Sequence, residues 1–83
     1  MDNNKDRMQQ RISVIRSIEG FDTVNPVMDL KFIDHVRRTL HGLGLYSGGI
    51  NSIKDISITN LILKARDEKP MRASYVSKKR RPR

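Results

Sequence analysis

The 83-residue chain carries 17 lysine and arginine residues against nine aspartate and glutamate residues, which gives a formal net charge of +8, and it contains no cysteine. A chain of this length forms one small domain and buries only about 60–65% of the surface that it exposes when unfolded. Without cysteines, neither a disulfide framework nor a thiolate zinc site can reinforce the core, and we expect a reducing, intracellular setting.

The first eleven residues are polar and of mixed charge, whereas a secretory signal needs an apolar stretch behind its basic start. We therefore expect no signal peptide. The longest apolar run, Leu61–Leu63, is far shorter than the roughly 20 residues that span a bilayer. These features predict a protein without a membrane span, located in the cytoplasm, or in the nucleus if the host is eukaryotic.

The positive charge is concentrated at one end of the chain. Residues 1–68 carry ten basic and nine acidic side chains, whereas residues 69–83 carry seven basic side chains and no acidic one. We therefore expect a nearly neutral body over 1–68 and a basic tail over 69–83, which is the pattern typical of an arm that binds a polyanion. The tail is poor in apolar residues and contains two prolines, so we expect it to be disordered in isolation.

The first predicted helix covers residues 4–19. Its apolar residues recur at three- and four-residue spacing, as on one face of a helix: Met8, Ile12, Ile15 and Ile18. Gly20 follows its last turn and can supply the positive φ that closes a helix. Residues 20–27 then form a turn-rich linker.

The second predicted helix begins at Asn25 and Pro26, because asparagine caps free amide groups and proline is best tolerated in the first helical turn. It is expected to end at His41 or Leu43, since glycines follow at 42 and 44. Its apolar stripe is Val27, Leu30, Ile33, Val36, Leu40 and Leu43, with Phe32 beside it.

After a glycine-rich connection over residues 42–49, the sequence allows a short helical turn at 50–53 and a third helix over 55–66, capped by Asp55 or Ser57. The buried face of that helix is predicted to be Ile58, Leu61, Ile62 and Ala65. A strand is the alternative, because residues 56–59 alternate in period two. We favour the helix, since a lone strand would lack a partner. The expected fold is mostly α, a small bundle of about three helices with a disordered basic C-terminal tail.

Nothing in the sequence indicates an enzyme, a metal site or a cofactor. His35 and His41 lie about 240° apart around a helix, so they cannot share a metal ion as residues four apart can. The glycines of residues 42–49 follow a predicted helix, whereas a dinucleotide-binding loop follows a strand. We expect that connection to be a linker and the protein to be non-enzymatic.

A helix-turn-helix unit is one alternative for residues 26–66. In that arrangement the third helix would present its polar side chains to a DNA groove: Ser57, Thr59, Asn60 and Lys64. Such motifs usually join their helices through three or four residues, and this connection is longer. We favour the simpler interpretation, in which the third helix is only amphipathic.

The leading hypothesis is a small accessory or regulatory protein that binds DNA or RNA phosphates through its basic C-terminal arm. Most of the affinity is expected from Arg72, Lys78, Lys79, Arg80, Arg81 and Arg83, with Arg37, Arg38 and Lys64 extending the footprint onto the body. Tyr75 would stack on an unpaired base. The tail has other interpretations: solubility alone, nuclear import, or attraction to an anionic membrane surface.

The competing hypothesis is a protein-binding regulator, an inhibitor or adaptor of the kind found among small phage proteins. It would act through its amphipathic helical body, with a partner protein or a second copy of the chain completing the burial of apolar residues. The basic tail would then steer association with an acidic partner.

Overall fold

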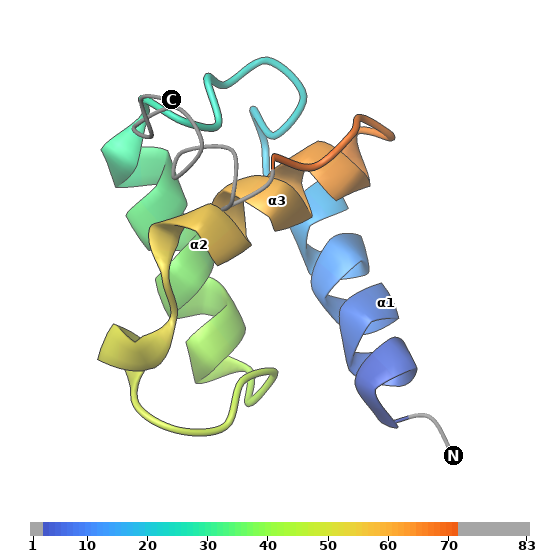
Figure 1. The fold of residues 1–83 in the computed structure, drawn as a ribbon, viewed down its shortest axis with the longest axis vertical. Coiled ribbons are helices and arrows are strands. Elements are labelled where there is room, and N and C mark those ends of the chain that lie inside the picture. Colours follow the sequence, from blue (N-terminus) through green and yellow to red (C-terminus); the bar gives the residue numbers. More distant parts are fainter. Residues whose placement is uncertain (1–2, 72–83) are drawn as a thin grey trace, which may run out of the picture.

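The computed structural model describes residues 3–71, which form three α-helices and one short 3₁₀ turn (Figure 1). The elements are α1 (Asn3–Arg16), α2 (Leu30–Gly42), η1 (Ile50–Ser52) and α3 (Asp55–Ala65). The expected mostly α fold is confirmed, and the described part of the chain contains no strand. Among these helices, none combines the length and the apolar character needed to cross a membrane.

Helix α3 is the central element of the fold. It packs against both α1 and α2, and its contact with α1 is the most extensive one between helices. In Figure 1 it lies across the space between them. Six of its 11 residues are buried, namely Ile58, Thr59, Leu61, Ile62, Leu63 and Ala65. The predicted buried face is therefore confirmed, and the alternative of a strand over 56–59 is wrong.

Helix α1 contributes Ile12 and Ile15 to the core, with Met8 and Ile18 packed against it, as its spacing predicts. The helix ends at Arg16, however, three residues before the predicted end. The amides of Ser17 and Ile18 bond to carbonyls three residues back, those of Val14 and Ile15. The chain then turns at Gly20, which has the expected positive φ, 93°.

Helix α2 begins at Leu30, so the predicted start at Pro26 is wrong. Asn25 does cap a turn, because its Oδ1 accepts hydrogen bonds from the amides of Val27 and Met28, each at 3.0 Å. That turn stops at Asp29, whose backbone is not helical and whose side chain caps α2 instead. The sequence therefore holds two capping residues four apart, and the second one starts the helix.

The change of start also shifts the apolar stripe of α2. Its central residues Ile33, Val36 and Leu40 are buried in the core. The predicted members at its two ends, Val27, Leu30 and Leu43, are instead exposed. In place of Leu43, Leu45 joins the core.

The C-terminus of α2 explains why Leu45 is buried. The amide of Gly44 donates to the carbonyl of His41, and the amide of Leu45 donates to that of Leu40. With a φ of 75° at Gly44, this is a Schellman motif, which folds the chain back so that Leu45 contacts the last turn of the helix. The predicted role of the glycines after α2 is therefore confirmed at Gly44.

Helix α3 ends in the same motif, but a non-glycine residue occupies the left-handed position. The amide of Asp67 donates to Lys64 and that of Glu68 donates to Leu63, while Asp67 has a φ of 61°. At the other end of α3, the N-cap residue is Lys54 and makes no side-chain capping bond. The predicted caps at Asp55 and Ser57 are therefore wrong, and Asp55 has a different partner.

Candidate nucleic-acid interface

Most of the predicted interface lies beyond the described residues. Outside 3–71 lie Arg72, Lys78, Lys79, Arg80, Arg81 and Arg83, and with them Tyr75. Their involvement in binding stays a prediction. The structure does fix the position of Met71, the last described residue before these positions. Asn60 on α3 donates from its amide nitrogen to the carbonyl of Met71 at 2.9 Å, and its Oδ1 accepts from the amide of Met71 at 2.7 Å.

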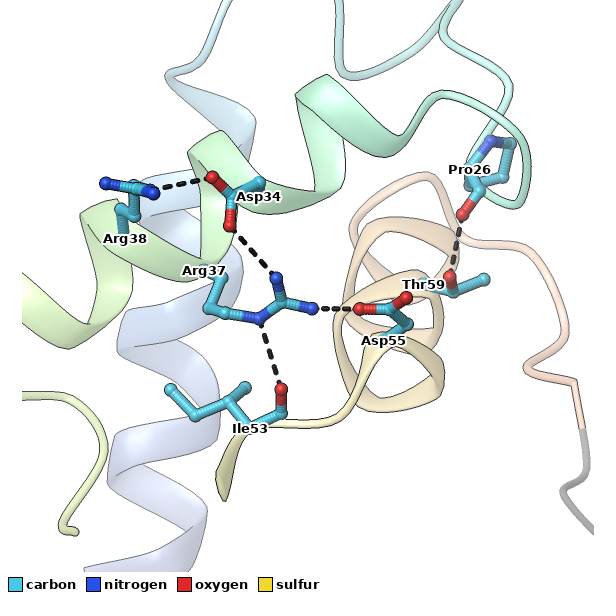
Figure 2. Close-up of polar contacts among 7 residues, drawn as sticks. All are labelled: Pro26, Asp34, Arg37, Arg38, Ile53, Asp55 and Thr59. Carbon is cyan, nitrogen blue, oxygen red and sulfur yellow. Dashed lines mark hydrogen bonds and ion pairs between the residues drawn. The ribbon is translucent and has the colours of Figure 1, made fainter. Parts of the chain in front are cut away.

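Arg37 is a structural residue of the helical body. Its guanidinium lies between α2 and the start of α3, with only 16% of the side chain exposed (Figure 2). Nε donates to the carbonyl of Ile53 at 3.1 Å, Nη1 donates to Asp34 at 3.0 Å, and Nη2 donates to Asp55. Because all three nitrogens already have acceptors within the chain, Arg37 is poorly placed to bind an external phosphate.

Arg38 differs sharply from its neighbour. Its side chain is 71% exposed and has one partner, Asp34, whose Oδ2 accepts from Nε at 2.7 Å (Figure 2). The hydrogen bond from Arg38 is the main cause that lowers the pKa of Asp34, with Arg37 adding to it. An exposed arginine with an exposed ion pair can exchange its carboxylate for a phosphate at little cost, so Arg38 fits the predicted role.

Lys64 is exposed on α3 and lies away from the arginine pair. It borders a hollow between α1 and α3, whereas Arg37 and Arg38 border another hollow beside Lys54. The three predicted body residues therefore do not form one cluster. The hollow beside Lys64 also contains Arg11.

Several arginines of the body donate hydrogen bonds to backbone carbonyls far away in the sequence. No pattern in the sequence predicted these bonds. Besides Arg37, the donors and their acceptors are Arg11 to Leu45, Arg16 to Ala65, and Arg66 to Val24. These side chains fasten loops and helix ends to one another. Within residues 3–71, by contrast, the lysines make no ion pair or side-chain hydrogen bond, so much of the body's available positive charge is lysine.

Two of the side chains that a helix-turn-helix unit would present to DNA are engaged within the chain. Thr59 is buried, and its hydroxyl donates to the carbonyl of Pro26 at 2.7 Å (Figure 2). Asn60 holds Met71, as described above. Because α3 is also the most buried helix, its geometry is that of a core element and not of an exposed recognition helix.

Tyr46 forms a further contact that the sequence did not predict, with Arg11. The guanidinium carbon of Arg11 lies 4.0 Å from the centre of the Tyr46 ring, and the Nε and Nη2 of Arg11 both donate to the carbonyl of Leu45, at 3.0 and 2.7 Å. Burial raises the pKa of the Tyr46 phenol above its ordinary value, and the nearby charge of Arg11 partly opposes this rise. No short-range pattern could reveal this pair, since its members lie 35 positions apart.

The histidines take part in ordinary packing and loop contacts. His35 is exposed and its ring lies tilted against that of Phe32, with 6.4 Å between the centroids. The Nε2 of His41 lies 3.1 Å from the carbonyl of Gly48. Over residues 3–71, no three histidine, cysteine, aspartate or glutamate side chains come together as metal ligands.

Comparison with known proteins gives no match: no family model, no curated protein and no solved structure is significantly similar to this chain.

Proposed function

We propose that this protein is a small, non-enzymatic accessory or regulatory protein that binds DNA or RNA, with the basic residues of 69–83 as its main contacts to phosphate. The observation that carries the proposal is the segregation of charge, since seven of the eight net positive charges belong to these 15 residues. A polyanion is the partner that such a segment binds most readily.

The contacts of the body support an external partner for this segment. Four acidic side chains of the body already form ion pairs with its own arginines, and they are Asp34, Asp55, Asp67 and Glu68. The basic segment would compete with these arginines for the four carboxylates. The phosphates of a nucleic acid have no arginine partner from this chain.

The proposal is tested by the salt dependence of binding. If about five basic residues neutralise phosphates, log K for a duplex falls with log salt with a slope of roughly −4 to −5. A chain lacking residues 77–83 loses five basic residues, so its slope should become much shallower and its affinity at low salt should fall steeply. The matched control keeps the length and replaces these five residues with glutamine, and it should behave like the truncation. Unchanged affinity in both variants would refute the proposal.

One observation favours protein binding as a second candidate function. The turn before α2 and the first residue of that helix expose three apolar side chains close together in sequence, Val27, Met28 and Leu30, of which Met28 is 72% exposed. Most residues of the apolar stripes of α1 and α2 are already buried in the core of the chain. A pull-down with and without nuclease separates the two functions: partners lost on nuclease treatment favour nucleic acid, and partners that survive it favour protein binding through the body.

A further inference from the structure

We propose that the hollow between α1 and α3, which is bordered by Pro70 near the start of the basic segment, binds one unpaired nucleotide of the nucleic acid. This inference rests on the proposed function and makes it more specific, because it predicts a preference for single strands. The groups that would make the contacts are Arg11, Tyr46 and Lys64.

The size and lining of the hollow suit a ligand with a flat apolar part and a charged part. Its volume is about 360 Å³, which lies near the lower end of the range of about 300–1,000 Å³ for small-ligand sites. Met8 and Leu61 contribute apolar surface, while Ser57 and Lys64 contribute polar groups. A nucleotide combines these two kinds of surface in its base and its phosphate.

The stacked pair of Arg11 and Tyr46 is the feature that points to a base. Unpaired bases stack on aromatic rings and on the flat face of arginine. Here the guanidinium is already held in place by its two hydrogen bonds to Leu45, so little side-chain entropy remains to be lost on binding. Lys64, exposed at the edge of the same hollow, can reach the phosphate of a stacked nucleotide.

The connection between Asn60 and Met71 places the start of the basic segment, residues 69–71, beside this site. Pro70 lines the hollow. The residue after it, Met71, is held against α3 by its two hydrogen bonds with Asn60. Twelve residues follow, and whatever their conformation they reach at most about 40 Å from Met71. A strand bound in the hollow therefore meets the tail charges at high effective concentration, and both contribute to one binding event.

The test compares two substitutions in the hollow with matched controls in the full-length chain. Lys64→Gln removes a charge at the hollow, and Lys31→Gln removes one from an exposed lysine of α2 that does not line it. Tyr46→Leu removes the ring, whereas Tyr46→Phe keeps it. Binding is measured by fluorescence anisotropy with a labelled single-stranded oligonucleotide and with a duplex of the same sequence, at two salt concentrations.

We expect Tyr46→Leu to weaken single-strand binding about tenfold, since the ring on which the base stacks is lost, and to change duplex binding less than about twofold. Lys64→Gln should reduce the single-strand salt slope by about 0.7. Tyr46→Phe and Lys31→Gln should bind single strands nearly as well as the unaltered chain. Circular dichroism establishes that each variant is folded, and if Tyr46→Leu is not, the comparison of Lys64→Gln with Lys31→Gln decides.

The outcomes separate this inference from the proposed function. If the unaltered chain binds neither probe at low salt, the proposed function fails. If it binds both probes but Lys64→Gln matches Lys31→Gln, or a folded Tyr46→Leu weakens both probes equally, the nucleotide site is refuted while the proposed function stands.

Discussion

Two adjacent arginines on α2 should respond very differently to the same substitution. Replacing Arg37 with glutamine is expected to destabilise the protein by about 2 kcal/mol, because it leaves the carbonyl of buried Ile53 without its donor, a loss of about 1–3 kcal/mol. The lost ion pairs with Asp34 and Asp55, whose carboxylates are substantially exposed, add only a few tenths of a kcal/mol. Arg38→Gln removes one exposed ion pair and should cost less than about 0.5 kcal/mol.

Urea unfolding followed by far-ultraviolet circular dichroism measures both losses. The m-value of the urea transition should stay constant. In thermal unfolding, 2 kcal/mol corresponds to a decrease in Tm of about 8–16 °C for a domain of this size. Arg37→Lys serves as a further variant. It keeps the positive charge but lacks the planar fork that reaches three acceptors, so it should lose most of the same stability.

Equal losses for Arg37→Gln and Arg38→Gln would show that the bond to Ile53 contributes nothing, and the structural role of Arg37 would be refuted. The two variants should also differ in binding. Under the proposed function, Arg38→Gln reduces the salt slope for duplex DNA by about 0.9. Arg37→Gln leaves the slope unchanged at temperatures where it is folded.

Three further predictions concern single contacts. Thr59→Val should destabilise the protein by about 1 kcal/mol in urea unfolding, because the carbonyl of Pro26 loses its donor; an unchanged midpoint would mean that water replaces the hydroxyl. Asp67→Gly should stabilise it by about 0.5 kcal/mol, since the relief of strain at the positive φ exceeds the larger folding entropy of glycine and the loss of the exposed ion pair with Arg16, whereas Asp67→Val should destabilise it. The lowered pKa of Asp34 implies stability that is complete above the unfolded pKa of about 3.8 and is lost as the pH falls further; Asp34→Asn should flatten this part of the stability profile, and an unaltered profile would contradict the assignment.

The local elements could be predicted from the sequence because each depends on residues close together in the chain. The spacing of apolar residues identified the core faces of α1 and α3, and Gly44 ended α2 as expected, since helical periodicity and capping act within a few residues. The start of α2 could not be decided in this way. Asn25 and Asp29 both cap, and the turn between them is held against α3 by a long-range contact, the bond from Thr59 to the Pro26 carbonyl 33 residues away.

The sequence by itself determined the helical fold class and the division of charge between body and tail. Only the tertiary structure decided which positive charges the body has available. Arg37 and Arg38 are alike in sequence, yet one donates to a carbonyl 16 residues away and the other faces solvent. The physical reason is that the acceptors available to an arginine include backbone carbonyls from distant parts of the chain. The positions of these carbonyls depend on how the helices pack. The same packing brings Arg11, Tyr46 and Lys64 to one hollow, which no spacing along the chain indicates.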